Sequence, residues 1–519
     1  MKSIKNLKPL CLITALIIIL SAFVFSSTAA EEKPLTNTVA EVTAVNAVDN
    51  DNITAADGYD HGYVPTISAF QNANGSYTVC IQQKDSTLKI VETDKSGKLI
   101  NEITVAESFG EFTAFTKGSD GTYYALFCAP NLDNDKTAMS LRLNNYSIDG
   151  KILRTVDIPS YAPDTFLGIR KLNCGNNVLC ENGNYITGYI GREMLAVDGI
   201  ELYHQASYGF AVDLKTFTQL KPEHPLYTPY VTHSFHQYII KDGTDFIYVD
   251  RGDADPKRSF HITKMSGKNT WEILVMGDSF EFKGEYGSNE TYGQLGGLVK
   301  TNYGYLLVGT YQNTTEDITK SPANIFTQIF DTNTLATQKE KYITNYTNDN
   351  IYTVSNPKAA QISADTIAVP YMLTNNHSEL SSMRIAYING KGELTGDKAV
   401  DTKGIVPRYG QVFYNSANDS IDWFSVKDGM LVLYSTALEN SHYVEETTTS
   451  TPPVAEETTT KAEESTTQSE PTTATTTQAP ETQTHPNEQP AERSFFQRII
   501  DFFVGIYNWI VNFFTSLIP

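Results

Sequence analysis

Side chains that could carry acid–base chemistry or bind a polar ligand are densest near the middle of the chain. This group combines imidazole, amide, carboxylate and cationic side chains: His233, Gln237, Asp250, Asp253, Lys257 and Arg258. Successive side chains of a strand point to opposite faces, so His233 and Gln237 share one face and His236 lies on the other. This alternation argues against one metal bound by both histidines. A tight turn at Asp242-Gly243 would return residues 250–258 beside this strand, where carboxylates, cations and imidazole would converge.

Three interpretations of this group remain open. The first is a hydrogen-bonded network that braces the fold, in which Asp253 pairs with Lys257 or Arg258. The second is a binding site for a sugar or a peptide. The third is a hydrolase site, in which two of Asp250, Asp253 and Glu281 act as paired carboxylates. The sequence contains no GxSxG, HExxH, P-loop or dinucleotide-binding motif. We therefore predict no catalytic residue and no cofactor.

The cysteines add one covalent prediction. Cys174 and Cys180 bracket a Gly-Asn-Asn segment, so a disulfide that closes this local loop is predicted if the chain is exported. Cys80 and Cys128 fall on strand-like runs, where buried free thiols are an equally good interpretation. The sequence has no CxxC pair and no metal-ligand spacing, and no metal site is predicted.

The elements that would position these side chains repeat along the chain. Turns followed by aromatic or β-branched runs recur about every 60 residues, at Gly75, Gly121, Gly183, Gly243, Gly304, Asp365 and Gly429. A second class of turn alternates with the first, so each period holds two hairpins and four strands. Four-stranded units stacked in series are typical of a β-propeller. The sequence predicts an all-β fold with seven four-stranded blades, with six or eight blades as alternatives.

The limits of the propeller follow from where this pattern starts and stops. Strand-like sequence runs from residue 61 to residue 443, and residues 31–60 are polar without sustained periodicity. We therefore predict a flexible segment over 31–60 and a propeller over 61–443. The last repeat lacks its second turn and stops near Leu438. The missing strand is expected from the start of the domain, around Val64–Phe70.

Both ends of the chain differ from the repeats. Residues 1–30 combine early lysines, an apolar run and small residues before Glu31, which predicts a cleaved signal peptide. Residues 444–493 are rich in Thr, Glu and Pro and predict a disordered, extended linker. Residues 494–519 place polar residues in one stripe at helical spacing and predict a hydrophobic amphipathic helix. This helix could span a membrane, lie on its surface, associate with its own copies or dock on the propeller.

Charge excludes one class of partner. The chain has 39 lysine and arginine residues against 60 aspartate and glutamate residues, a formal net charge of −21. A nucleic-acid-binding protein needs the opposite sign to neutralise phosphates. Nucleic acid is therefore not expected as a partner, whereas an extracellular glycan or protein ligand is compatible with this balance.

Two parts of the sequence resemble known proteins. The pattern His-Ser-Phe-x-Gln from His233, followed by Gly-Asp-Ala-x-Pro from Gly252, resembles a group of secreted bacterial propeller-like proteins. These proteins tend to place Arg directly after the Pro, where this chain has Lys257 and then Arg258. The Thr-rich linker with an aromatic terminal helix resembles the tails of exported proteins from anaerobic Gram-positive bacteria.

The resemblance implies a fold and a compartment rather than an activity. We expect an exported cell-surface protein that displays a propeller binding module for carbohydrate or protein on a flexible stalk, in contact with the membrane or envelope. The alternative is a propeller-type glycoside hydrolase or another extracellular hydrolase.

Overall fold

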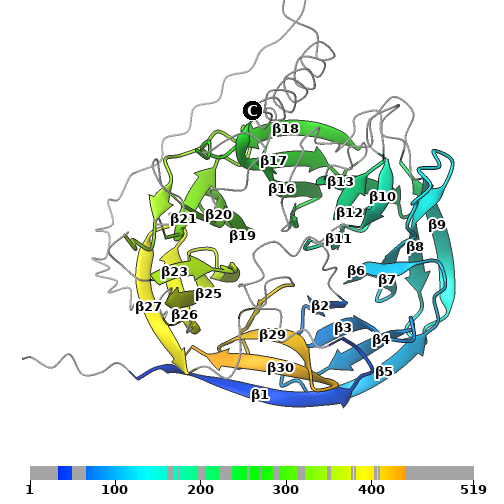
Figure 1. The fold of residues 1–519 in the computed structure, drawn as a ribbon, viewed down its shortest axis with the longest axis horizontal. Helices are drawn as coiled ribbons and strands as arrows, with labels where there is room; N and C mark the ends of the chain where they lie inside the picture. The colour runs from blue at the N-terminus through cyan, green and yellow to red at the C-terminus, as the bar shows by residue number, and fades with distance from the viewer. Residues whose placement is uncertain are drawn as a thin grey trace, which may run out of the picture. The chain divides into compact units, whose positions relative to one another are not determined.

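Figure 1 shows the computed structural model of the chain. It describes residues 33–48, 66–159, 168–172, 175–195, 205–220, 237–253, 257–268, 271–283, 293–312, 322–347, 352–375, 378, 381–401, 406 and 410–438. All of these residues belong to one compact unit that ends at Glu446. The predicted signal peptide (1–30), linker (444–493) and terminal helix (494–519) lie outside the described residues.

The described chain is built from antiparallel sheets that follow one another around a ring (Figure 1). Five of the sheets each form one blade, and a nine-stranded sheet comprises the last two blades, which β1 (Leu35–Ala44) joins by pairing with a strand of each. Within a blade, successive strands run from the centre of the ring to its rim (Figure 1). Blades 1 and 2 consist of β2 (Ile67–Gln71), β3 (Tyr77–Gln82), β4 (Leu88–Thr93), β5 (Leu99–Val105), β6 (Glu111–Lys117), β7 (Tyr123–Cys128), β8 (Met139–Tyr146) and β9 (Ile152–Pro159). Blade 3 consists of β10 (Ile169–Leu172), β11 (Val178–Glu181), β12 (Tyr185–Met194), β13 (Gln205–Asp213) and β14 (Thr218–Gln219).

The remaining blades repeat this arrangement. Blades 4 and 5 consist of β15 (Tyr238–Asp242), β16 (Asp245–Asp253), β17 (Arg258–Ser266), β18 (Glu272–Asp278), β19 (Gln294–Thr301), β20 (Gly304–Tyr311), β21 (Asn324–Phe330) and β22 (Lys341–Tyr342). Blade 6 consists of β23 (Tyr352–Ser355), β24 (Ala360–Ser363), β25 (Thr366–Asn375), β26 (Ser381–Asn389) and β27 (Leu394–Asp401). Blade 7 consists of β28 (Phe413–Asn415), β29 (Ser420–Lys427), β30 (Met430–Ala437) and β1 (Leu35–Ala44).

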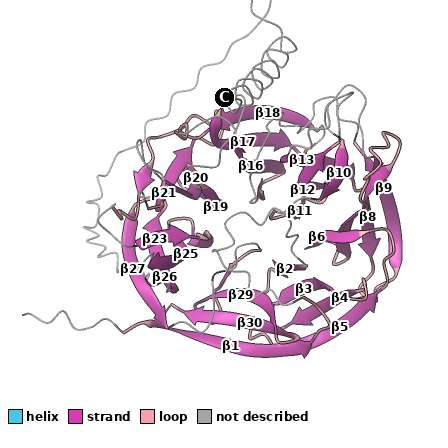
Figure 2. Ribbon diagram, in the orientation of Figure 1, coloured by secondary structure: helices cyan, strands magenta, loops and turns pink. Residues whose placement is uncertain are grey.

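This topology is a seven-bladed β-propeller, as the repeat period predicts. Strands and loops account for all the described residues (Figure 2). Within this part of the chain there is accordingly no helix that could cross a membrane. The predicted hairpin turns are present, and Gly75 and Gly121 both adopt a φ of 82°, a conformation that glycine reaches without steric cost.

The ring is closed by a strand that the sequence analysis assigned to a flexible segment. β1 pairs antiparallel with β30, from Asn37 opposite Thr436 to Ala44 opposite Met430, and its first residues pair parallel with β27. The prediction of a flexible segment over 31–60 is therefore wrong for Leu35–Ala44. The closing strand was also misplaced, because Ile67–Gln71 forms the innermost strand of blade 1. As a rim strand, β1 buries little of its surface, so it lacks the alternating apolar pattern of a half-buried strand.

Adjacent blades are joined by apolar side chains and by buried hydrogen bonds. Between blades 2 and 3, for example, the core includes Leu126, Ile186 and Phe210. At the ring closure, the Tyr77 hydroxyl of blade 1 donates to Asp422 Oδ2 of blade 7 at 2.7 Å. The blades therefore interlock through specific polar contacts as well as apolar packing.

Candidate ligand-binding cleft

The structure brings part of the predicted polar group together around Asp250 on β16. Asp250 is 2% exposed, and its Oδ1 accepts a hydrogen bond from the Arg251 backbone N–H at 2.7 Å. Its Oδ2 accepts from the hydroxyls of Ser207 and Tyr189, two residues of blade 3. Gln237 Nε2 donates to Ser207 Oγ at 3.2 Å. Asp250 and Gln237 thus meet through Ser207, which sequence reasoning missed because it lies on the preceding blade.

The other predicted residues of this group have separate surroundings. Lys257 Nζ lies 3.5 Å from Asp278 Oδ2 on the neighbouring strand β18. Arg258 is 4% exposed and donates to the Lys283 carbonyl at 3.4 Å. Asp253 is opposite Arg258 in the β16–β17 register, but its side chain is not described. His233 lies outside the described residues.

His261, which follows this polar group in the sequence, lies beside it on β17. His261 Nδ1 is 2.5 Å from Asp278 Oδ1. The hydrogen bond with His261 is the main reason why the pKa of Asp278 is lowered, with help from the charges of His261 and Lys257. A Cβ at Gly252 would lie 1.9 Å from His261 Nε2. Glycine at this position therefore leaves room for the imidazole between the two strands.

The hydrogen bonds of Asp250 connect blades 3 and 4, which indicates a structural role for this residue. Its carboxylate is buried and accepts hydrogen bonds from both blades, which is the usual way to accommodate a buried charge. The catalytic interpretation requires a carboxylate that can reach a substrate, and at 2% exposure Asp250 does not meet this requirement. Among the described residues, no cluster of three or more His, Cys, Asp or Glu side chains could hold a metal ion.

Polar contacts also connect blades that are far apart in the sequence. The Gly410 backbone N–H, before blade 7, donates to Asn176 Oδ1 of blade 3 at 3.2 Å. Asn176 Nδ2 in turn donates to the Gln237 carbonyl at 3.0 Å. Lys358 of blade 6 is 1% exposed, and its Nζ donates to the Tyr238 hydroxyl of blade 4 at 3.3 Å. The Gly410–Asn176 and Lys358–Tyr238 hydrogen bonds thus link blades that are not adjacent in the ring.

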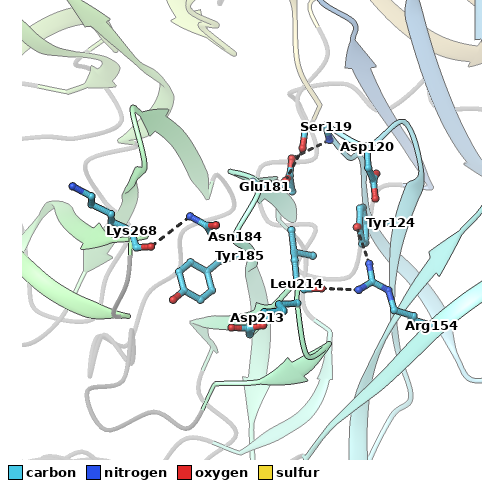
Figure 3. Close-up of a pocket in the computed structure, with 12 residues that line it drawn as sticks. Ser119, Asp120, Tyr124, Arg154, Glu181, Asn184, Tyr185, Asp213, Leu214 and Lys268 are labelled. Atoms are coloured by element: carbon cyan, nitrogen blue, oxygen red, sulfur yellow. Dashed lines mark hydrogen bonds between the residues drawn. The ribbon is translucent and has the colours of Figure 1, made fainter.

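An open polar cleft of 570 Å³ lies instead where blades 2 and 3 meet (Figure 3). Its walls are the β6–β7, β11–β12 and β13–β14 turns, with Arg154 from β9 and Lys268 from the turn after β17. The β6–β7 and β11–β12 turns are equivalent turns of successive blades, and the β13–β14 turn is the second turn of blade 3. Tyr124 and Tyr185 line the cleft but are 1% and 7% exposed, which leaves little ring surface for stacking.

The carboxylates of the cleft hold its turns in place. Glu181 accepts from the Ser119 backbone N–H and hydroxyl, both at 3.1 Å, and from the Gly183 backbone N–H. Asp120 Oδ1 accepts from its own turn, from the Thr122 backbone N–H at 3.0 Å. Asp213 Oδ1 does the same in its turn. Each carboxylate therefore satisfies turn N–H groups that would otherwise have no partner.

The cations of the cleft have different surroundings. Arg154 donates to the Leu214 carbonyl at 2.6 Å and to the Tyr124 hydroxyl at 3.4 Å, and its guanidinium lies 4.4 Å from the Phe217 ring centre. These partners are all uncharged. Lys215 and Lys268 are exposed. Within the described chain, none of these three cations forms an ion pair.

The predicted disulfide includes a residue outside the described part of the chain. Cys174 lies outside the described residues, and Cys180 on β11 has a free thiol in the structure. Cys80 and Cys128 are buried free thiols, which is one of the two interpretations that the sequence left open. Burial raises the pKa of the Cys128 thiol to about 12, so this group is protonated at neutral pH.

Comparisons with known proteins give structural likenesses only. No protein-family model matches the chain, and no curated protein matches it. Among solved structures, the chain is similar to the extracellular domains 1–2 of Drosophila Semaphorin 1a, with 10% identity, 77% of this chain and 88% of that chain covered, and a TM-score of 0.40.

Two further solved structures resemble this chain with similarly low sequence identity and TM-score. The polysaccharide lyase Uly1 has 9% identity over 78% of this chain and 100% of that chain, with a TM-score of 0.40. The NanB sialidase of Streptococcus pneumoniae has 10% identity over 77% and 71%, with a TM-score of 0.36. At these values the likenesses carry no functional argument, and the propeller assignment rests on the blade topology itself.

Proposed function

We propose that this chain is an exported surface protein whose propeller binds an extracellular ligand, a carbohydrate or a protein, in the cleft between blades 2 and 3. The observation that carries the proposal is the cleft itself. It is open and polar, and its exposed lysines are free of ion pairs within the described chain, whereas the Asp250 group is buried and hydrogen-bonded. A ligand can therefore reach groups in the cleft that still have hydrogen-bonding capacity.

The alternative, a glycoside hydrolase, receives less support. Most such enzymes need two carboxyl groups that face the bound sugar, about 5 to 10 Å apart. In the cleft, Glu181 already uses both carboxylate oxygens to hold turns, and Asp250 is buried. Of the other two sequence candidates, Glu281 is exposed, and the side chain of Asp253 is not described.

The proposal for the rest of the chain is based on sequence. Residues 1–30 would direct export, and residues 444–493 would act as a flexible stalk. Residues 494–519 would retain the protein at the membrane or envelope, or bring copies of the chain together. The resemblance to secreted bacterial propeller-like proteins supports the same compartment.

A panel of glycans and extracellular proteins tests the binding role. The full chain should bind at least one member without converting it, and Asp250→Asn and Asp253→Asn should leave that binding unchanged once folding is verified. Turnover of a glycan that either substitution abolishes would show that the protein is an enzyme. Binding can be measured by calorimetry, and turnover by mass spectrometry of the glycan.

Fractionation of the native cells tests retention. The full chain should stay with the envelope, whereas a version truncated after Glu492 should be released into the medium. Release of both versions would contradict an anchoring role for residues 494–519.

A further inference from the structure

The cleft between blades 2 and 3 supports a narrower statement about its ligand, which rests on the proposed binding function. Arg154, Lys215 and Lys268 border the cleft and form no ion pair with the described carboxylates. The chain as a whole carries a net charge of −21. The cleft is lined by as many cations as carboxylates, which is a local exception on an acidic protein.

The acidic residues of the cleft form hydrogen bonds with its turns and not with these cations. Glu181 uses both oxygens, and Asp120 and Asp213 each use Oδ1, to hold turns. One oxygen of each aspartate is left to accept a hydrogen bond. The cleft thus presents cationic donors together with a few acceptors.

The neighbouring cleft provides an internal comparison. It lies between blades 1 and 2, has a volume of 430 Å³ and is lined by the corresponding turn around Asn74. Its cation, Lys117, lies 2.7 Å from Glu92 and is therefore neutralised within the protein. The same kind of turn and cleft occurs without the unpaired positive charge, so that charge is a specific property of the cleft between blades 2 and 3.

We propose that this cleft binds an acidic saccharide, a sugar that carries a carboxylate. Lys215 and Lys268 would attract the carboxylate, while the remaining oxygens of Asp120 and Asp213 would accept hydrogen bonds from sugar hydroxyls. An acidic peptide fits less well, because it brings repeated negative charge towards these two aspartates without hydroxyl donors. A neutral sugar would leave the lysines without a counterion.

Two matched pairs of saccharides test this proposal on the full chain. The first is tetragalacturonate with its methyl ester, and the second is sialyllactose with lactose. In at least one pair the acid should bind about tenfold more tightly than its neutral counterpart, and the preference should shrink as salt rises, because salt screens exposed charges. Calorimetry at 50 and 500 mM NaCl (about threefold change in Debye length) measures the ratio of the two affinities and its dependence on salt.

Substitutions test whether the two lysines of the cleft cause the preference for the acidic saccharide. The double variant Lys215→Gln/Lys268→Gln should weaken binding of the acid about tenfold, since each exposed charge contact contributes a few-fold, and should leave the neutral sugar unchanged. Lys151→Gln is the matched control, because Lys151 occupies an equivalent turn of blade 2 and pairs with Asp149 at 2.6 Å. It should bind like the unmodified chain.

The outcomes separate the two proposals. Equal binding of acid and neutral sugar, or an unchanged double variant, overturns the acidic-saccharide inference while the binding function stands. Tighter binding of a glutamate peptide than of either acid also overturns it. If no saccharide, peptide or protein of the panel binds, the proposed function fails and the inference fails with it.

Discussion

At the residue scale, this propeller uses buried tyrosine hydroxyls to connect its blades. Tyr77 donates to Asp422 across the ring closure at 2.7 Å. Tyr305 of blade 5 donates to Asp242 of blade 4, also at 2.7 Å. Asp422 is fully buried and accepts a further hydrogen bond from Asn415 at 2.8 Å. Because the acceptors are carboxylates, each of these bonds is stronger than one between neutral groups.

The Tyr77 bond can be tested by removing one hydroxyl. Tyr77→Phe should lower the free energy of unfolding by about 1 to 3 kcal/mol, because Asp422 loses a donor in a buried site. Urea denaturation measures the change. Tyr303→Phe is the control, since Tyr303 is 47% exposed, and should change stability by less than about 0.5 kcal/mol. Equal effects of the two substitutions would contradict the proposed role of Tyr77.

The same tyrosines predict how stability changes at alkaline pH. Burial, assisted by a neighbouring aspartate, raises the pKa of Tyr77, Tyr305 and Tyr371 above the ordinary value. In the unfolded chain these hydroxyls ionise near pH 10, while in the folded chain they stay protonated. Their contribution to stability is therefore complete below about pH 10 and is lost as the pH rises further.

This pH dependence can be followed in two ways. The urea midpoint should fall between pH 9 and pH 11 (about one unit on either side of the unfolded tyrosine pKa), and tyrosinate absorbance should rise together with unfolding. A constant midpoint over this interval, or full tyrosine ionisation in the folded protein, would show that the hydroxyls are not protected.

At the element scale, the N-terminal strand β1 determines whether the ring closes. It completes blade 7 beside β30 and also contacts β27 of blade 6. Without it, blade 7 would keep only β28, β29 and β30, and the edge of β30 would be exposed. A strand from the start of the chain thus joins the last blade to the rest of the propeller.

Interrupting this strand should destabilise the whole ring. Ala40 is opposite Leu433 in the β1–β30 ladder, so Ala40→Pro would place a residue without a backbone N–H and with a fixed φ inside this strand and should lower the melting temperature. Thermal denaturation measures the loss. A synthetic peptide of residues 33–46 should restore stability to a chain that lacks them. An unaffected melting temperature in Ala40→Pro would contradict the closing role of β1.

At the scale of the whole molecule, the repeat period predicted the all-β propeller and its seven blades, because the first type of turn recurs in each of them. The closing strand was missed since a rim strand such as Leu35–Ala44 buries too little surface to show a pattern. Asp250 and Gln237 were predicted from local sequence, but Ser207, which connects them, was not. Ser207 lies on β13 of the preceding blade, and this strand is not paired with β16.

The cleft could not be predicted from one sequence at all. Its walls come from turns around Ser119, Asn184 and Lys215, which have ordinary hairpin sequences. Whether these turns form one cleft depends on the relative orientation of blades 2 and 3, and no local sequence pattern determines that orientation. What the sequence did contain was the spacing of these turns, which places equivalent turns on one face of a propeller.

The central claim is that ligand binds in the cleft between blades 2 and 3, and blocking this cleft tests it most directly. Asn184 is an exposed residue of the cleft wall, so Asn184→Trp should fill the cleft without disturbing the core. Ile100→Trp is the matched control, because Ile100 is 63% exposed and lines the neighbouring cleft.

The measurement is calorimetric binding of the tightest panel ligand to the full chain and to both variants. The account predicts that Asn184→Trp abolishes binding, a loss of at least about a hundredfold or 2.7 kcal/mol, while Ile100→Trp binds normally. Normal binding by Asn184→Trp, with its fold verified by an unchanged melting temperature, would contradict the account.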